Sequence, residues 1–194
     1  MSPASLNHTL ESCLLRCFLL PVELRVLIVR FFVIAITNEN IRIYVRMAND
    51  KIRDLTCGAI HYWDTSKVTD MDRLFYASFD FNMDISRWDV SNVTNMSRMF
   101  NSAHSFNQPL NDWNVSNVIN MEQMFIYARS FNQPLYKWNV SKVNKMNYMF
   151  YSTLPFCHNL NSWQVGPNVE KTHIFTYTQL FRRKKIPLWA HLSV

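Results

Sequence analysis

The chain has 194 residues, of which 48% are apolar, so it is long and apolar enough to bury a core, and general disorder is excluded. The net charge is +6, but the basic residues are spread along the chain, so a dedicated nucleic-acid binder is not expected. With only 2 glycines a glycine-rich phosphate loop is excluded, and other residues must make the turns. Asn and Asp tolerate left-handed backbone best, so we expect them at those turns.

The first predicted element is a helix within residues 20–32. Pro21 suits its first turn, and Glu23 suits the positive end of the helix dipole. Apolar residues recur at helical spacing along one face of it. This stretch resembles the opening of an F-box, the helical module that docks on a ubiquitin-ligase adaptor. The resemblance implies a partner-docking helix that consists of Leu20, Pro21, Leu24, Leu27, Ile28 and Phe31.

The same segment has a second interpretation, as a cap. A second helix is predicted from Asn40 to about Met47, with Asn38 or Asn40 as its N-cap. Residues 1–55 would then form a helical N-terminal cap over the open core of the repeats that follow. The cap and the F-box-like segment remain alternatives at this point.

No membrane span and no signal peptide are predicted for the N-terminal region. The most apolar stretch runs from Leu14 to Ile36, and a span needs about 18 apolar residues without interruption. Charged residues interrupt this stretch at Arg16, Glu23, Arg25 and Arg30. Glu11 also lies where a leader would be free of acidic residues, so we expect an intracellular protein.

Residues 56–165 repeat a unit of 25 residues, which is the strongest signal in the sequence. The aromatic positions of this unit are Trp63, Trp88, Trp113, Trp138 and Trp163, then Phe75, Phe100, Phe125 and Phe150. The methionine positions are Met71, Met96, Met121 and Met146. One unit cannot bury such side chains alone, so the units must stack, and each series becomes a file through the core. We therefore predict that these tryptophans, phenylalanines and methionines are buried.

Each unit predicts two short elements. The second half carries apolar residues at helical spacing, namely Val118, Met121, Met124 and Phe125, and predicts a short helix. Ser116 or Asn117 would be its N-cap. The segment from Phe106 to Asp112 is expected to be extended, although Pro109 cannot donate to a sheet ladder.

The unit resembles a known repeat family. Phe106-Asn107-Gln108-Pro109-Leu110 and Trp113-Asn114-Val115-Ser116-Asn117-Val118 resemble the BspA-type leucine-rich repeat, and more closely its 25-residue version in Mycoplasma-like surface proteins of unknown function. The resemblance implies an α/β repeat solenoid of the leucine-rich-repeat type, with one short parallel strand and one short helix per turn. It implies adhesion or protein binding without catalysis, and surface display. Repeats preceded by a helical segment also resemble proteins encoded by large DNA viruses of protists.

The C-terminal residues 166–194 are predicted to be a degenerate repeat and a basic tail. Lys171 stands at the position of the methionine file, and Gly166-Pro167 interrupts the unit. A dense basic run, Arg182-Arg183-Lys184-Lys185, follows. This run is either a solvated tail or an address or anion site.

No catalytic, cofactor or metal site is predicted. The 6 histidines show no metal-ligand spacing, and Cys13 and Cys17 have no matching second pair. Asp64 and Asp89 follow tryptophans where other units carry Asn114 and Asn139, which favours turn formation over acid–base chemistry. The sequence therefore predicts a non-enzymatic protein-binding or scaffolding solenoid, and the alternative is an F-box-like adaptor that recruits a substrate through its repeats. Nucleic-acid binding is a third hypothesis, because basic residues lie beside aromatic residues of the repeats. The regular spacing of the tryptophans argues against it, since it indicates that they are buried in the core.

Overall fold

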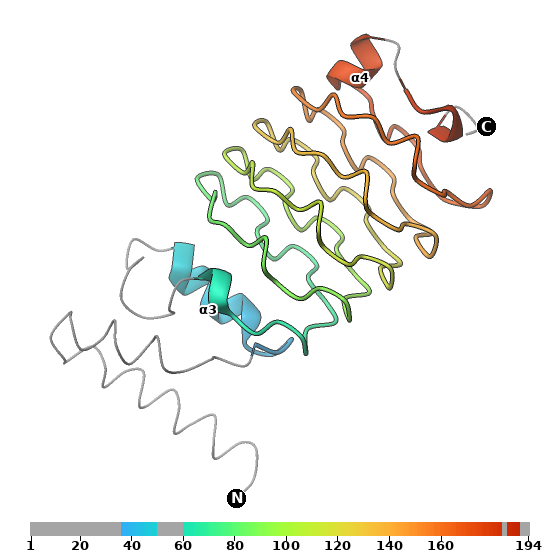
Figure 1. The fold of residues 1–194 in the computed structure, drawn as a ribbon. Helices are drawn as coiled ribbons and strands as arrows, with labels where there is room; N and C mark the ends of the chain where they lie inside the picture. Colours follow the sequence, from blue (N-terminus) through green and yellow to red (C-terminus); the bar gives the residue numbers. More distant parts are fainter. Residues whose placement is uncertain (1–35, 50–59, 184–185, 191–194) are drawn as a thin grey trace, which may run out of the picture.

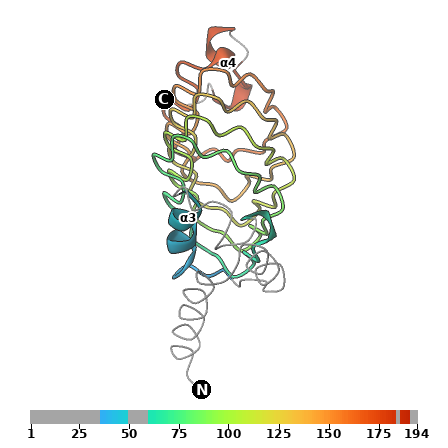
Figure 2. The same ribbon diagram turned by 90° about the vertical axis from the view of Figure 1, so that its left-hand side faces the viewer.

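The computed structural model describes residues 36–49, 60–183 and 186–190. Residues 60–183 form coils of similar size that stack on one another along one axis (Figures 1 and 2). We number the coils from the N-terminal end as coil 1 (60–84), coil 2 (85–109), coil 3 (110–134), coil 4 (135–159) and coil 5 (160–183). The helices lie at the two ends of this stack: α3 (Ile41–Asn49) and the 3-10 helix η1 (Ile60–Tyr62) at one end, α4 (Gln179–Arg182) and η2 (Leu188–Ala190) at the other.

Backbone hydrogen bonds join each coil to the next. In coil 1, alternate residues donate their N–H groups to carbonyls of coil 2, for example Met71 to Asn95 at 2.8 Å and Phe75 to Met99 at 2.9 Å. Residues between these donors form hydrogen bonds within their own coil instead. The N–H of Leu74, for example, donates to the carbonyl of Met71 at 3.2 Å. The same pattern recurs from coil 2 to coil 5, so each coil offers a row of N–H groups to the one after it.

The predicted α/β leucine-rich-repeat fold is wrong. Apart from η1 and α4, the described coils consist of turns and irregular segments. Their only strand-like pairing is a chain of isolated parallel bridges: Asp70 with Asn95, Asn95 with Asn120, Asn120 with Lys145, and Lys145 with Glu170. The helix predicted over Val118–Phe125 is a run of turns, because Gln123 has a φ of 58° that an α-helix does not allow. Hydrogen bonds from residue i to i−3 produce the three-residue spacing of the apolar side chains. The segment expected to be extended, Phe106–Asp112, forms no bridge.

Left-handed backbone is frequent in the coils, but not where the sequence predicts it. None of the ten described non-glycine residues with positive φ is Asn or Asp; they are Arg73, Ala77, Arg98, Ser102, Gln123, Tyr127, Tyr148, Ser152, His173 and Tyr177. This conformation costs roughly 1–2 kcal/mol per residue. In coils 1 to 4 each of these residues donates its N–H to the next coil, so inter-coil hydrogen bonding offsets the cost.

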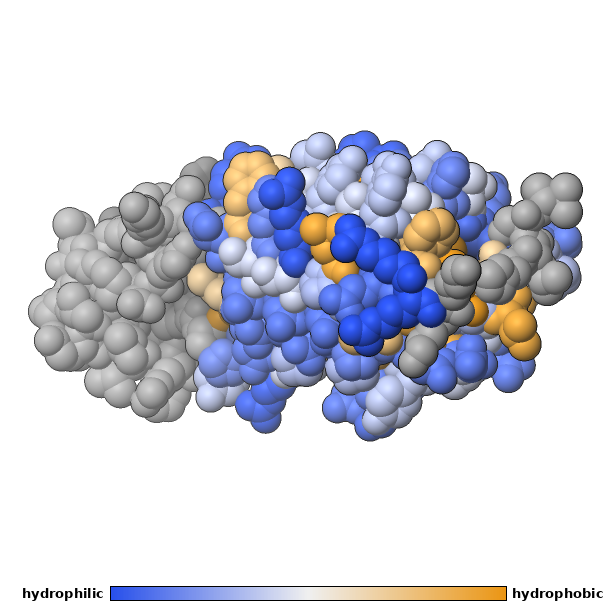
Figure 3. Space-filling model, turned by 90° about the horizontal axis from the view of Figure 1, so that it is seen from above, coloured by the Kyte–Doolittle hydropathy of each residue, from blue (hydrophilic) through white to orange (hydrophobic). Residues whose placement is uncertain are grey.

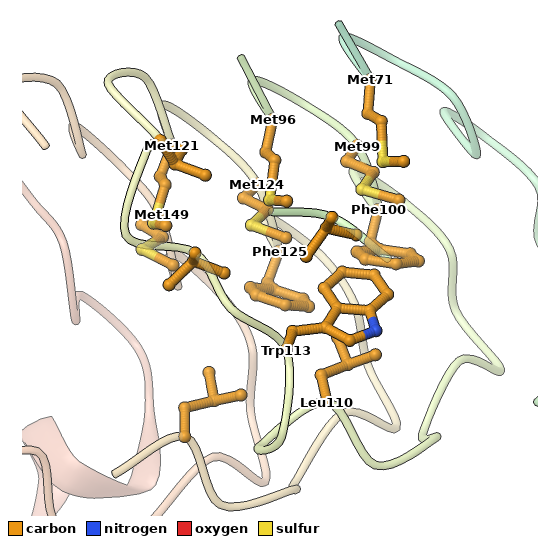
Figure 4. Close-up of a cluster of buried hydrophobic side chains, with 14 of the residues drawn as sticks. Met71, Met96, Met99, Phe100, Leu110, Trp113, Met121, Met124, Phe125 and Met149 are labelled. Carbon is orange, nitrogen blue, oxygen red and sulfur yellow. The ribbon is translucent and has the colours of Figure 1, made fainter. Parts of the chain in front are cut away.

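The core consists of the predicted files. The five repeat tryptophans are 3–5% exposed, and the predicted methionines and phenylalanines are buried completely. Phenylalanine rings of neighbouring coils are stacked, with centroids 5.4 Å apart for Phe75 and Phe100. Each indole N–H from coil 2 onward donates to a carbonyl of the preceding coil, as Trp138 does to Leu110 at 2.8 Å. Figure 4 shows methionines, phenylalanine rings and Trp113 packed together across adjacent coils.

The first coil is in contact with residues 36–45. Ile36, Ile41 and Val45 are buried, and the ring of Tyr44 lies edge-on to Trp63 at 6.0 Å. The helix predicted from Asn40 to Met47 is observed as α3, and the side chain of Asn40, directly before it, accepts from the N–H of Thr37 at 2.9 Å. The proposed docking residues lie outside the described part of the chain: Leu20, Pro21, Leu24, Leu27, Ile28 and Phe31.

The last coil is followed by a partial continuation of the core. The Thr178 hydroxyl accepts from the N–H of Phe181 at 3.1 Å and caps α4. Trp189 then stacks on Trp163 with centroids 5.9 Å apart, and its indole N–H donates to the carbonyl of Leu160 at 3.0 Å. Trp189 therefore extends the tryptophan file, one residue later than the repeat spacing would place it.

Candidate interaction surface

Four tyrosines and one histidine of coils 3 to 5 gather on the surface of the stack. We call this group the tyrosine cluster: Tyr127, Tyr148, Tyr151, His173 and Tyr177. Tyr151 lies at its centre, with ring centroids 5.9 Å from Tyr127, 5.3 Å from Tyr177 and 5.7 Å from Tyr148. The first two of these pairs are nearly perpendicular, at 89° and 83°, the edge-to-face geometry that aromatic rings prefer.

The cluster lies directly beside the buried core. Tyr151 follows the buried Phe150, and Tyr127 and Tyr177 follow the core residues Phe125 and Phe175 by two positions. The core phenylalanines fix the backbone, so the tyrosine rings must point outward. Tyr127 is 41% exposed and Tyr177 is 51% exposed.

The backbone does not require tyrosine at these positions. Positions equivalent to Tyr127 are occupied by Ala77, Ser102 and Ser152 in other coils, with similar left-handed φ values of 54°, 60° and 54°. A bulky side chain is less favourable than a small one in this conformation. Coil stacking therefore does not require an aromatic ring at the position of Tyr127, and the position of Tyr151 carries a tyrosine in coil 1 as well, Tyr76.

The phenol of Tyr151 stays protonated at neutral pH. Partial burial raises its pKa above the ordinary value, and the neighbouring phenols of Tyr177 and Tyr127 raise it further. A hydrogen bond with the side chain of Tyr177 contributes to the same shift, so the two phenols at the centre of the cluster are coupled to each other.

The predicted core residues do not form this surface. The repeat tryptophans, methionines and phenylalanines are buried and out of reach of a partner. Of the basic run, Arg182 and Arg183 are described and exposed, on α4 and directly after it. A comparison of the units for shared residues identifies the core. The tyrosine cluster lies instead at positions where the units carry different residues, and this difference is the sequence signal that could have identified it.

The carboxylates beside the tryptophans make turns, as predicted. Asp64 accepts hydrogen bonds from the backbone N–H and the hydroxyl of Ser66 at 3.1 and 2.6 Å, and these bonds lower the pKa of Asp64. Asn139 accepts the equivalent bond from the N–H of Ser141 at 3.1 Å. Among the described residues, no group of three or more His, Cys, Asp or Glu side chains could hold a metal ion.

A shallow open pocket lies on another edge of the stack, lined by residues that include Tyr136, His158 and Ser162. The hydroxyl of Ser162 donates to the carbonyl of Tyr136 at 2.8 Å, and His158 Nε2 contacts the carbonyl of Asn132 at 2.9 Å. Both side chains are bound to backbone, so neither is positioned to activate the other for catalysis.

Exposed apolar side chains are scattered elsewhere. The face shown in Figure 3 is mostly hydrophilic where the chain is described, with small groups of hydrophobic residues among the hydrophilic ones. No helix in the described ranges is long and apolar enough to cross a membrane.

Comparisons with known proteins support the repeat resemblance. The model of the family described as "Mycoplasma protein of unknown function, DUF285" matches residues 45–163 and again residues 113–189. The two matches overlap within the repeats, as expected for a family whose unit is itself repetitive. A search of curated proteins and a search of solved structures each gave no significant match. The chain belongs to the DUF285 family of Mycoplasma-type proteins of unknown function.

Proposed function

We propose that this chain is a non-enzymatic protein-binding module and that the tyrosine cluster is its contact surface. The observation that carries the proposal is the gathering of four tyrosines and His173 from three adjacent coils on one exposed surface. Tyrosine is enriched at protein interfaces because it buries a large apolar area, loses little side-chain entropy and still offers a hydroxyl.

Coil stacking supports this role because it holds the cluster rigidly. The N–H of Tyr127 donates to the carbonyl of Tyr151 at 3.0 Å, and the N–H of Tyr148 donates to Thr172 at 2.9 Å. The rings also contact one another, so few rotamers are left to lose when a partner binds. A surface that is already ordered binds with a smaller entropic cost.

The test is proximity labelling in the native host cell with three forms of the full chain. The wild type is compared with a Tyr127→Ser, Tyr151→Ser double variant and with a Tyr136→Ser control. Tyr136 is 53% exposed and lies outside the cluster, so its loss removes an exposed tyrosine without touching the proposed surface. We expect a set of proteins that the wild type and the control label and the double variant does not.

Identical labelling by all three forms would refute the role of the cluster. The melting temperature of the double variant should stay close to that of the wild type, because both side chains are at least partly exposed. The F-box-like adaptor remains a prediction about residues 20–32, which no described residue tests. A pull-down of the ubiquitin-ligase adaptor that depends on those residues would support it.

A further inference from the structure

The shallow pocket beside Tyr136 has the size of a small-molecule site. Its volume is about 390 Å³, and sites for small ligands usually measure about 300–1,000 Å³. It lies outside the tyrosine cluster, and residues of successive coils line it: Pro134, Tyr136, His158, Asn159, Asn161 and Ser162.

The pocket lies where the coils differ in sequence. The position of Asn159 is occupied by Pro134 in the preceding coil, and that of Ser162 by Lys137. The ammonium of Lys137 reaches back to Asp112 at 2.7 Å, so its long side chain extends over the coil before it. The hydroxyl of Ser162 donates to the backbone instead, at 2.8 Å. Coil stacking therefore accommodates a larger residue at this position, and serine leaves space.

Several polar groups of the pocket are exposed and available to a ligand. Asn159 and Asn161 are both exposed, and Asn159 Oδ1 accepts from the N–H of Asn161 at 2.7 Å. This bond orients the Asn159 amide, so that its Nδ2 group can donate elsewhere. His158 Nε2 lies 2.9 Å from the carbonyl of Asn132, which can only accept, so in the neutral ring Nδ1 is an acceptor.

An exposed aromatic side chain lines the same pocket. Tyr136 is 53% exposed. The other coils carry His61, Ser86, Asn111 and Asn161 at the equivalent position, so coil stacking does not require a tyrosine there. Its ring is an apolar surface beside the amide groups.

The composition of the lining restricts the kind of ligand. None of the six lining residues is Asp, Glu, Lys or Arg, so the lining offers no carboxylate, ammonium or guanidinium to pair with a charged ligand. A fully apolar ligand would cover the amides of Asn159 and Asn161 without pairing them, which is unfavourable. A matching ligand is neutral, with an apolar face for a ring and hydrogen-bonding groups around it.

We infer that this pocket binds a neutral saccharide. A pyranose ring has a face of C–H groups that packs on an aromatic ring, and each of its hydroxyls both donates and accepts. The ring of Tyr136 receives the C–H face, while the Asn159 and Asn161 amides and His158 Nδ1 bind hydroxyls. The inference does not rest on the role proposed for the tyrosine cluster, which consists of other residues.

The test is a titration of the full chain followed by NMR, with the side-chain amide signals of Asn159 and Asn161 as the readout. The probes are the neutral disaccharides maltose, cellobiose, lactose and N,N′-diacetylchitobiose. The comparison ligand is acetyl-triserine amide, which has hydroxyl and amide groups but no pyranose ring. We expect at least one disaccharide to shift both signals, with a dissociation constant on the order of millimolar, and the tripeptide to leave them unchanged.

Variants of Tyr136 test the contribution of its ring. Tyr136→Ala should weaken binding of the disaccharide by about tenfold or more, whereas Tyr136→Phe keeps the ring and should retain most of the affinity. Tyr76→Ala is the matched control, because Tyr76 is 51% exposed and lies in coil 1, away from the pocket. It should bind the disaccharide as the wild type does.

A second variant fills the pocket with residues that the fold already accommodates. Asn159→Pro combined with Ser162→Lys restores the residues of the preceding coil, Pro134 and Lys137, so it should fold and lose the binding. The double variant of the tyrosine cluster should bind the disaccharide normally. The two proposals can therefore fail separately.

Three results would overturn the inference. One is the absence of any shift of the pocket signals with all of the disaccharides, at concentrations up to tens of millimolar. Another is binding of the tripeptide as tight as that of the best disaccharide, which would show a general polar pocket. The third is unchanged affinity of the folded Tyr136→Ala variant or of the folded variant with the filled pocket.

Discussion

Replacement of Trp163 by alanine tests the stacking of the core most directly. Its ring lies between those of Trp138, at 6.2 Å, and Trp189, at 5.9 Å, and the residue is 3% exposed. A buried tryptophan removes roughly 150–250 Å² from water, which at about 25 cal/mol per Å² corresponds to about 4–6 kcal/mol. Measured Trp→Ala costs are about 3–5 kcal/mol, so we expect Trp163→Ala to lower the free energy of unfolding by about that amount.

Trp189→Ala is the matched control, because among the described residues Trp189 has a stacked tryptophan on one side only, and it is half-buried. Its replacement should cost about half as much as that of Trp163, since only one face loses its contacts. Equilibrium unfolding in urea, followed by near-ultraviolet circular dichroism, measures both values. A loss below about 1 kcal/mol for Trp163→Ala, or equal losses for the two variants, would refute the argument that stacked coils stabilise each other through this file.

Three further outcomes follow from local geometry. Ala77→Gly should raise the melting temperature, because glycine removes the steric cost of a φ of 54°, roughly 1–2 kcal/mol, whereas Ala103→Gly, at a buried position without positive φ, should lower it. Thr178→Ala should cost about 1 kcal/mol of stability in urea unfolding, because it removes the side chain that caps α4. The hydrogen bonds from Ser66 lower the pKa of Asp64 in the folded chain, so its contribution is present above the unfolded value of 3.8 and is lost as the pH falls through the lower folded value. Asp64→Asn should therefore reduce the drop in melting temperature between pH 5 and pH 3, and an unchanged drop would contradict this assignment.

The repeat period predicted the core because both the burial of a side chain and its recurrence result from the stacking of equivalent residues in neighbouring coils. A side chain that stacks on its own equivalent in the next coil must recur at the same position, as Phe75 and Phe100 do at 5.4 Å. The sequence could therefore identify the buried files without any knowledge of the backbone between them. The repeat period did not predict Trp189 as a member of the tryptophan file, because a single inserted residue moves it out of register. Its indole N–H nevertheless donates to a carbonyl of the preceding coil, as the indoles of the repeat tryptophans from coil 2 onward do.

The secondary structure could not be predicted in the same way. Apolar residues three apart suit a helix, but they suit a succession of turns with i to i−3 hydrogen bonds equally well, and the distinction lies in residues such as Gln123 with left-handed φ. Neither glycine nor asparagine marks these positions. Their conformation is stabilised by N–H groups that bond a residue in the next coil, such as Gln123 to Asn147 at 2.9 Å, and local propensity does not contain that information.

The positions at which the coils differ are therefore the ones that coil stacking does not determine. The core files and the turn residues recur because every coil needs them, and they are buried or bound to backbone. Tyr127, by contrast, belongs to a row that contains alanine or serine in coils 1, 2 and 4, and Lys171 replaces a methionine of the core. Both departures cost stability, one through a bulky side chain at positive φ and the other through a buried charge. Both departures also lie toward the C-terminal end of the described stack.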